Sequence, residues 1–339
     1  MDTPKLKGVG NFLTLLGQEK KHATKYTIYM LAKVFFRIHK LAIRMGVHVI
    51  PVHYFSEIPN ILELEKIKDV WAKKSDLPGL SINLDEQVNN LRTICLNFQS
   101  EYAGNKVFKE ALSKMGMLEY GYIEAQALHA VVRYYKPRKI IEIGSGISTH
   151  CMLAALELNK RETGQHAELT CIEPYRSDRL KALIGIKLIP EIVQAIPFEV
   201  FTELQAGDML FIDSSHTVRP GGDVNYLILE VLPRLRKGVI VQFHDIFLPY
   251  DYQPNILQSF FHWTETSLLR AFLIFNERVK IIFCLTQLHF DRSSALKEVF
   301  PEYNPSSNVD GLQDPRHKPF ERSELLINLH YPSSIYIKM

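Results

Sequence analysis

Residues 138–149 read RKIIEIGSGIST, an apolar run that ends in Gly-Ser-Gly and passes at once into a helix-like sequence. The run predicts a buried strand, and Ser148 is one of two neighbouring hydroxyl residues that could cap the following helix. In a doubly wound sheet, ligands lie across the carboxyl ends of the strands, where glycines let the backbone approach them. The stretch therefore predicts a strand, a ligand-binding loop around Gly144 and Gly146, and a helix.

Short apolar runs alternate with helical patterns from residue 126 onward. This alternation is typical of βαβ units, and so predicts an α/β fold with a parallel sheet and helices on both faces. The later runs that read as strands are ELTCIEP (168–174), EIVQAI (191–196), DMLFIDSS (208–215), GVIVQFHDI (238–246), VKIIFCLTQLHF (279–290) and SSIYIKM (333–339).

The composition is that of an ordinary globular protein of 339 residues, with 46% hydrophobic and 23% charged side chains. Forty basic and 37 acidic residues leave a net charge of only +3. Because nucleic-acid-binding domains usually carry a strong basic stripe, we expect no nucleic-acid partner. The four cysteines are far apart and form no CxxC pair, which indicates buried thiols in a reducing compartment. No signal-peptide pattern is visible, so a cytoplasmic location is expected.

Residues 1–50 form a basic segment in which lysines and arginines interrupt the apolar run YTIYMLAKVFFRIHKLAI (26–43). The charges are too frequent for a membrane-spanning helix, so an amphipathic helix is expected within residues 19–48. Its basic face could contact an anionic membrane surface weakly, contact a partner, or remain solvated. We expect a helical cap on the substrate side at 51–125 and the α/β domain at 126–339.

Two carboxylates stand at strand ends beside the glycine loop. Glu142 lies two residues before Gly144, where its side chain can point into the ligand crevice. Glu173 ends the second strand, where a carboxylate can accept hydrogen bonds from both hydroxyls of a ribose. A dinucleotide fold also uses such an acid, so an NAD-type oxidoreductase is an alternative. Its fingerprint, however, requires Gly or Ala at the third small position, where this sequence has Thr149.

These elements resemble the class I S-adenosylmethionine-dependent methyltransferases, in particular a bacterial branch with DSSH and HDI elements. The resemblance covers roughly residues 120–290 and implies a Rossmann-like, mostly parallel sheet of seven strands with S-adenosyl-L-methionine as cofactor. The stretches that carry it are EIGSGIST (142–149), CIEP (171–174), GDMLFIDSSH (207–216), DVNYLILEVLPRLRKGVIVQFHDIFLPYDY (223–252) and HWTETSLLRAFLIFN (262–276).

The resemblance also implies which residues bind the cofactor. The glycine loop would line the methionine part, and Glu173 would bind the ribose. One departure concerns the adenine, because this branch often has an acidic residue after the third strand and the sequence has Ala195 there. The full set of implied cofactor-binding residues is Glu142, Gly144, Ser145, Gly146, Ser148, Glu173 and Asp213.

Polar side chains follow the fourth and fifth strands, which are expected to be neighbours. Methyl transfer needs an acceptor held in line and removal of the acceptor's proton. Since imidazole titrates near neutrality, His216 and His244 are candidate general bases, with Asp213 as a further catalytic residue. Alternatively, Asp213 and Asp245, with a histidine or Asn225, could hold Mg²⁺ or another divalent cation that lowers the acceptor's pKa.

We therefore expect O-methylation of a small molecule or glycan. The alternatives are N-methylation of a small molecule or peptide, an NAD-type oxidoreductase, and a non-catalytic cofactor-binding scaffold; an oligomer is compatible with each of them. A Ser-His-Asp triad is excluded because the sequence lacks a G-x-S-x-G elbow. Side chains with further expected roles are Asp223, at a helix N-terminus, and Tyr250, Tyr252 and Trp263, in the acceptor walls.

Overall fold

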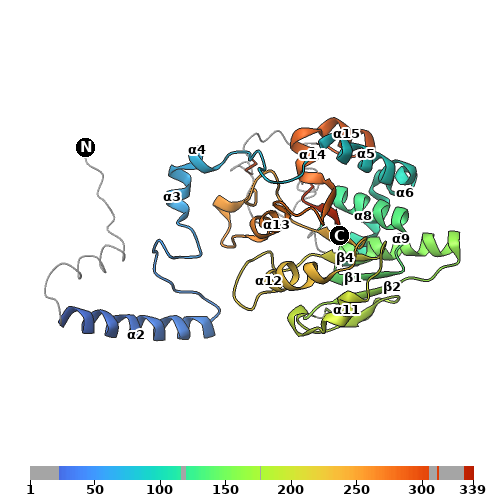
Figure 1. Ribbon diagram of the computed structural model, residues 1–339. Helices are drawn as coiled ribbons and strands as arrows, with labels where there is room; N and C mark the ends of the chain where they lie inside the picture. The colour runs from blue at the N-terminus through green and yellow to red at the C-terminus, as the bar shows by residue number, and fades with distance from the viewer. Residues whose placement is uncertain (1–22, 116–119, 176, 305–310, 313–331) are drawn as a thin grey trace. The chain divides into compact units, whose positions relative to one another are not determined.

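The computed structural model describes residues 23–115, 120–175, 177–304, 311–312 and 332–339 (Figure 1). Contacts between residues divide the chain into two compact units, Met1–Lys68 and Asp69–Met339. Residues 69–125 thus belong to the same compact unit as the sheet that follows them. The domain limits expected after residues 50 and 125 remain a prediction.

The first unit contains the helices α2 (Ala23–Arg44) and α3 (Ile61–Lys66). Part of the segment expected to form a basic helix, residues 19–22, lies outside the described residues. Basic side chains that recur at intervals of four and three residues share one side of α2: Lys33, Arg37, Lys40 and Arg44. Among the residues that the structure describes, no helix is long and apolar enough to cross a membrane. A contact of α2 with a membrane surface remains a prediction.

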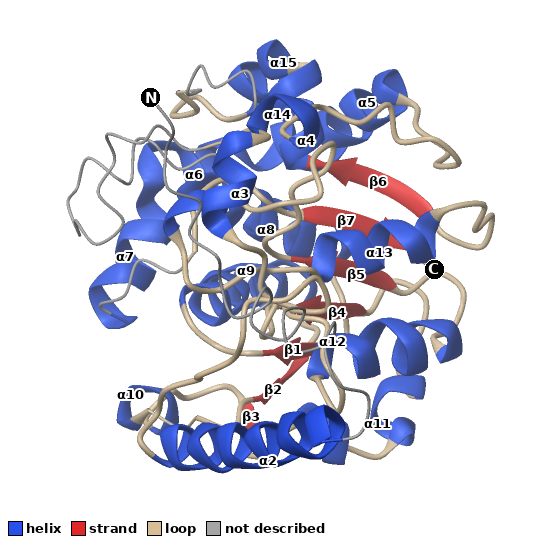
Figure 2. Cartoon of the chain, turned by 90° about the vertical axis from the view of Figure 1, so that its left-hand side faces the viewer, coloured by secondary structure: helices blue, strands red, loops and turns tan. Residues whose placement is uncertain are grey.

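The second unit is built on a seven-stranded sheet in the order β3-β2-β1-β4-β5-β7-β6 (Figure 2). Neighbouring strands from β3 to β5 are parallel, and β7 is antiparallel to both β5 and β6. The expected α/β fold with a mostly parallel sheet is confirmed. The strands are β1 (Lys139–Ile143), β2 (Glu168–Ile172), β3 (Lys187–Ile189), β4 (Met209–Ile212), β5 (Ile240–Phe243), β6 (Lys280–Cys284) and β7 (Ile335–Lys338).

Helices connect these strands. Short 3-10 turns lie at 96–98, 103–105, 193–195, 232–234 and 256–258, and a π-helical turn at 226–231 continues α12. From the junction of the two units onward, the helices are α4 (Lys68–Trp71), α5 (Leu84–Cys95), α6 (Gln99–Tyr102), α7 (Lys106–Met115), α8 (Tyr122–Tyr135), α9 (Ile147–Thr163), α10 (Asp178–Lys181), α11 (Phe198–Thr202), α12 (Asp223–Asn225), α13 (Glu265–Leu273), α14 (Leu285–Asp291) and α15 (Ser293–Val299).

Helices cover both faces of the sheet (Figure 2). Ile140 of β1 packs with α8 and α9 in one core cluster, whereas Ile141 packs with α12 and α13 in another. Leu210 and Phe211 of β4 divide between the two clusters in the same way. Because both faces are covered, the strands are apolar throughout, as is typical of parallel sheets. Because β1, β2, β4 and β5 are parallel, their carboxyl ends lie at one shared edge of the sheet.

The third strand differs from its prediction. β3 lies at Lys187–Ile189, and the apolar run at 191–196 instead contains a 3-10 turn. Pro190 separates the two, and it has no backbone N–H to continue a strand ladder. Ala195, expected directly after the third strand, lies in the 3-10 turn.

The run at 279–290 also differs from its prediction. β6 ends at Cys284, and the rest of the run folds as helix α14. Periodicity alone does not distinguish a buried strand from a buried helix, so a continuous apolar run hides such a boundary.

The loop after β1 meets the end of β4 at Gly144. The φ of Gly144 is +89°, and a Cβ added there would lie 2.4 Å from the carbonyl oxygen of Asp213. Backbone hydrogen bonds join the same elements: Asp213 N donates to Ile143 O (3.0 Å) and Gly144 N to Ile172 O (3.1 Å). At Gly146, by contrast, an added Cβ would meet nothing within 4 Å. Gly144 therefore joins two strand ends, while Gly146 faces open space.

Replacing Gly144 should destabilise the fold. In Gly144→Ala, a side chain must adopt a positive φ and push against the Asp213 carbonyl, at a cost of about 1–3 kcal/mol or more. Gly146→Ala is the matched control and should change the free energy of unfolding by no more than about 0.5 kcal/mol. Urea unfolding followed by circular dichroism measures both. Equal stability of the two variants would contradict the close approach at Gly144.

Candidate functional site

Glu142 is fully buried near the end of β1. Its carboxylate accepts hydrogen bonds from Ser148 Oγ (2.6 Å), Thr149 Oγ1 (2.7 Å) and Cys171 Sγ (3.1 Å). α9 begins at Ile147, so the two hydroxyl residues lie in its first turn and neither occupies the N-cap position. Although Glu142 was expected to point into the crevice, the structure turns it toward α9. It fastens the first turn of this helix to β1.

A pocket opens beside the N-terminus of α9. Gly146 is the N-cap residue, and its backbone N–H donates to Thr149 Oγ1 (3.0 Å). The loop residues and Asp213 were predicted to bind the cofactor, whereas Met115 and Tyr120 were not. The residues that line the pocket are Met115, Tyr120, Ser145, Gly146, Ile147, Ser148 and Asp213.

Glu173 follows β2 directly and is half-buried. Its Oε1 accepts a hydrogen bond from the backbone N–H of Tyr175 (2.7 Å). Because β2 pairs with β1 in parallel, Glu173 lies at the same edge of the sheet as the glycine loop. Its contact with a ribose remains a prediction.

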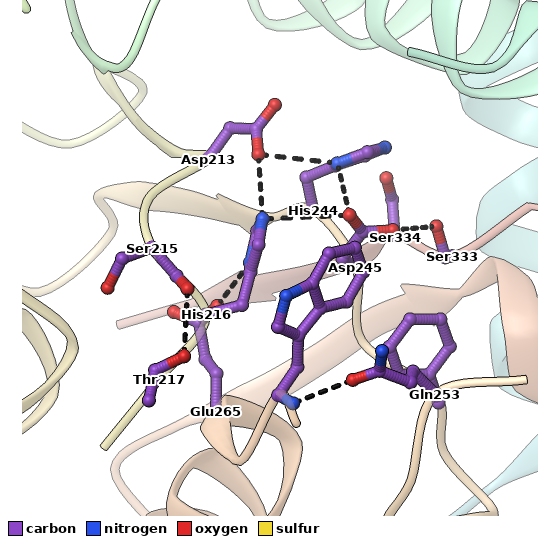
Figure 3. Close-up of polar contacts among 12 residues, drawn as sticks. Asp213, Ser215, His216, Thr217, His244, Asp245, Gln253, Glu265, Ser333 and Ser334 are labelled. Atoms are coloured by element: carbon purple, nitrogen blue, oxygen red, sulfur yellow. Dashed lines mark hydrogen bonds and ion pairs between the residues drawn. The ribbon is translucent and has the colours of Figure 1, made fainter. Parts of the chain in front are cut away.

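Asp213, His216, His244 and Asp245 meet at the carboxyl ends of β4 and β5 (Figure 3). One potential ligand atom from each lies within 4.8 Å of those of the others. His216 Nε2 is 3.2 Å from Asp213 Oδ1 and 3.6 Å from Asp245 Oδ2. His244 Nδ1 is 3.4 Å from each of the same two oxygens. The residues predicted at these strand ends therefore form one group, the Asp-His cluster.

Two buried glutamates lie outside the Asp-His cluster, one beside each imidazole. His216 Nδ1 is hydrogen-bonded to Glu265 Oε2 at 2.8 Å (Figure 3). His244 Nε2 lies 3.7 Å from Glu124 Oε1. Each imidazole thus has one nitrogen toward the aspartates and the other toward a glutamate.

Ser333 connects two parts of this arrangement. Its backbone N–H donates to Glu124 Oε1 (2.8 Å), and its hydroxyl donates to Asp245 Oδ1 (2.9 Å). Ser333, Glu124 and Glu265 were not among the predicted site residues. One available signal was the position of Glu124, a carboxylate in the first turn of α8, where every residue from 122 to 133 is buried.

The turns that carry two cluster residues have unusual backbones. His216 and Asp245 have φ values of 55° and 54°, in the left-handed region. Such residues cost about 1–3 kcal/mol each and concentrate at functional sites. Asp223 stabilises the turn after β4, which carries His216, by accepting hydrogen bonds from Ser215 N (2.9 Å) and Oγ (2.5 Å). The carbonyl oxygen of His216 accepts a further bond from Glu265 N (3.1 Å).

Electrostatic coupling between the imidazoles and the aspartates shifts the pKa of every member of the Asp-His cluster. Burial alone would lower the pKa of His216, but hydrogen bonds to Asp213 and Glu265 raise it to about 10. Against the same effect of burial, the Asp245 and Asp213 carboxylates raise the pKa of His244 well above its ordinary value. Burial would raise the pKa of both aspartates, yet the imidazoles hold it below the ordinary range.

A comparison with protein families identifies the part of the chain that contains these residues. Residues 141–246 match the model of a family described as a methyltransferase domain. This part of the chain is therefore similar to a methyltransferase domain. The match runs from β1 to the turn after β5 and includes the glycine loop, Glu173 and the whole Asp-His cluster. It confirms the resemblance to methyltransferases; the bacterial branch remains a prediction.

Individual proteins also resemble this chain. An uncharacterized protein of Archaeoglobus fulgidus is 27% identical over 197 residues, which are 51% of this chain and 80% of that one. A crystal structure of a SAM-dependent methyltransferase from Archaeoglobus fulgidus covers 68% of this chain and 97% of its own, at 13% identity and a TM-score of 0.31. The MycE methyltransferase of the mycinamycin biosynthetic pathway, in complex with Mg and SAH, covers 68% and 52%, at 13% identity and a TM-score of 0.35.

Other predicted site residues of the chain occupy different places. The ring of Trp263 lies 4.8 Å from that of His216, measured between centroids, so this predicted wall residue borders the Asp-His cluster. Tyr250 and Tyr252 are buried in a small core cluster of their own. Asn225, considered as a metal ligand, donates its amide to the carbonyl oxygen of Arg219 (3.1 Å).

Glu142 should make stability depend on pH. Burial raises its pKa from an ordinary 4.5 to about 7, although its three hydrogen bonds oppose the shift. The folded protein therefore holds this proton more tightly than the unfolded chain, and stability falls as the pH rises between these values. The loss amounts to about 3 kcal/mol, at about 1.4 kcal/mol per pKa unit.

Glu142→Gln removes this titration. Its free energy of unfolding, relative to the wild type, should rise between pH 4.5 and pH 7 and then level off. Urea unfolding across this pH range measures the difference, with the exposed Glu199→Gln as the control that follows the wild-type profile. A difference in unfolding free energy between Glu142→Gln and the wild type that does not change with pH would contradict the raised pKa of the buried Glu142 carboxyl.

Proposed function

We propose that this methyltransferase moves a methyl group from S-adenosylmethionine to a hydroxyl oxygen of a small molecule or glycan. The position of Asp213 supports this best. It lines the pocket beside Gly146, and its Oδ1 lies 3.2 Å from His216 Nε2 in the Asp-His cluster. One side chain therefore borders both the proposed donor pocket and the group of residues that would act on the acceptor.

The proposed donor site uses the predicted cofactor residues in two ways. Ser145, Gly146 and Ser148 line the pocket, where the open space beside Gly146 would admit the methionine part of the donor. Glu173, at the end of the neighbouring strand, would accept hydrogen bonds from the ribose. Gly144 and Glu142 would act without touching the donor, because they fix the loop to β4 and the first turn of α9 to β1.

The Asp-His cluster would prepare the acceptor. A hydroxyl oxygen attacks a methyl group well only as its proton leaves, so positive charge beside the developing oxyanion accelerates the reaction. The neighbouring carboxylates raise the pKa of both imidazoles, so while no other cation lies in the cluster they favour the charged forms of His216 and His244 over forms that could accept a proton. We therefore propose that the cluster assists by supplying positive charge. A histidine base would require a state in which one imidazole has lost its proton.

The alternative functions explain these features less well. A neutral amine attacks with its own lone pair and has less need of a cluster that stabilises an oxyanion. A non-catalytic scaffold would gain nothing from two buried imidazoles and two partly buried carboxylates, whose desolvation is costly. A dinucleotide site would need a small residue at position 149. The residue there is Thr149, whose hydroxyl donates a hydrogen bond to Glu142. The oxygen acceptor is thus the favoured proposal.

Filling the space beside Gly146 should prevent donor binding. In Gly146→Leu the new side chain would occupy the pocket, and we expect affinity for S-adenosylhomocysteine to fall at least ~10-fold, about 1.4 kcal/mol. Gly146→Ala adds only a methyl group at the same position. It is the control and should bind S-adenosylhomocysteine more tightly than the leucine variant. Isothermal titration calorimetry measures both, with circular dichroism as the check on folding. Wild-type affinity in a folded Gly146→Leu variant would refute this donor site.

The chemistry of the product tests the acceptor atom. The enzyme is supplied with S-adenosylmethionine carrying a ¹³C-labelled methyl group and with separate panels of phenolic, polyhydroxy, glycan and amine acceptors. We expect carbon NMR to show the label in methyl ethers, because the Asp-His cluster favours an acceptor that must lose a proton. Label found in methylamines, with the hydroxyl panels unreacted, would contradict the oxygen acceptor.

A further inference from the structure

We infer that Asp213, His216, His244 and Asp245 together bind one first-row transition-metal ion, such as Mn²⁺, Co²⁺ or Zn²⁺, in preference to Mg²⁺. The sequence suggested the two aspartates, with a histidine or Asn225, as metal ligands and the two histidines as bases. The geometry points instead to all four as ligands of a single ion. The ion's part in methyl transfer rests on the proposed function, whereas its binding does not.

The spacing of the four side chains fits one ion. Nitrogen and oxygen ligands lie about 2.0–2.2 Å from such a metal, so adjacent ligand atoms around it are separated by about 3.0–3.5 Å. The imidazole nitrogens and carboxylate oxygens that face one another in the Asp-His cluster are 3.2, 3.4, 3.4 and 3.6 Å apart. Every imidazole–carboxylate contact is therefore close to the separation that a shared ion requires.

His244 provides an independent indication of a missing ligand. Its side chain is 2% exposed, yet neither ring nitrogen has a hydrogen-bond partner of acceptable geometry. Leaving a buried polar group unsatisfied costs about 1–3 kcal/mol. Nδ1 lies 3.4 Å from oxygens of both Asp213 and Asp245, on the side where the ion would lie. A bound metal ion would take up the lone pair of this nitrogen.

The outer glutamates match the surroundings of a histidine metal ligand. Such a histidine almost always gives its second ring N–H to a carboxylate, a carbonyl or water, which fixes its tautomer and orientation. His216 Nδ1 lies 2.8 Å from Glu265 Oε2, which leaves Nε2 directed at the aspartates. His244 Nε2 lies 3.7 Å from Glu124 Oε1 and has Nδ1 directed the same way. Glu265 and Glu124 are therefore positioning residues for the two imidazoles.

The kinds of ligand determine which metal is favoured. Imidazole suits zinc and the neighbouring transition metals, whereas Mg²⁺ prefers oxygen ligands and usually keeps several of its waters. Two of the four ligands here are imidazoles, and both are almost fully buried, with side-chain exposures of 9% and 2%. A site with this composition should discriminate against Mg²⁺.

The ion would remain reachable from the pocket. The Asp213 side chain is 27% exposed and lines the pocket, and that of Asp245 is 15% exposed. When bound, a divalent ion supplies a Lewis acid that lowers the pKa of an adjacent hydroxyl. The chain's own residues would hold this charge at the boundary between the proposed donor pocket and the acceptor.

Titration with Co²⁺ alone tests the inference. The full chain is stripped with EDTA, dialysed and titrated with cobalt chloride, and the visible absorption of the ion reports nitrogen ligation. We expect saturation at one equivalent and a spectrum that persists in excess magnesium chloride. An absence of binding, or release of the ion by Mg²⁺, overturns the inference. Because neither donor nor acceptor is present, this result is independent of S-adenosylhomocysteine calorimetry on the same preparation.

Variants locate the ion. His216→Ala should lose the one-equivalent cobalt spectrum, whereas the exposed His166→Ala should retain it. Glu265→Gln keeps all four ligands and should weaken Co²⁺ binding by about 10–100-fold while preserving the spectrum. Its control is Glu298→Gln, which removes a largely exposed carboxylate elsewhere. If His216→Ala fails to fold, Glu265→Gln decides the question, and wild-type affinity in a folded Glu265→Gln or His216→Ala variant overturns the inference.

Discussion

The approach of the Gly144 backbone to the carbonyl oxygen of Asp213 brings the end of β1 into contact with the end of β4. A Cβ at position 144 would lie 2.4 Å from that oxygen, so only a residue without a side chain permits this spacing. The glycine loop carries one wall of the pocket, and the turn after β4 carries half of the Asp-His cluster. Their shared border at Asp213 therefore follows from a contact between two backbones.

The meeting of these strand ends places the charged side chains of the Asp-His cluster away from bulk water, and the cost of their desolvation must be offset. Two imidazoles and two carboxylates alternate, so that each imidazole faces both aspartates and each aspartate faces both imidazoles. Pairing of this kind offsets part of the desolvation cost, and removal of one member leaves its neighbours uncompensated. The four side chains should therefore behave as a unit. Two of them also occupy left-handed backbone, which adds strain that the surrounding hydrogen bonds must hold.

Much of the fold and part of the site could be predicted from the sequence. Alternating apolar and helical runs were enough for the parallel sheet, because strands covered on both faces are apolar throughout. The carboxyl-end rule was enough to gather Asp213, His244 and Asp245, since β4 and β5 are neighbours in the sheet. Glu124 and Ser333 could not be placed in this way. They come from α8 and from the approach to β7, and only tertiary packing brings them together.

The direction of a side chain was harder to predict than its position. Glu142 was expected to face the crevice because it stands near a strand end, but it is still inside β1, in register with Cys171 and Phe211. Successive side chains of a strand point to opposite faces, so Glu142 shares the face of Ile140 that α9 covers. Asp213 comes one residue after the end of β4 and is free of that constraint. Because Glu142 is in register with Phe211, Asp213 lies two positions further along the sheet. This offset decides which carboxylate is buried under a helix and which borders the pocket.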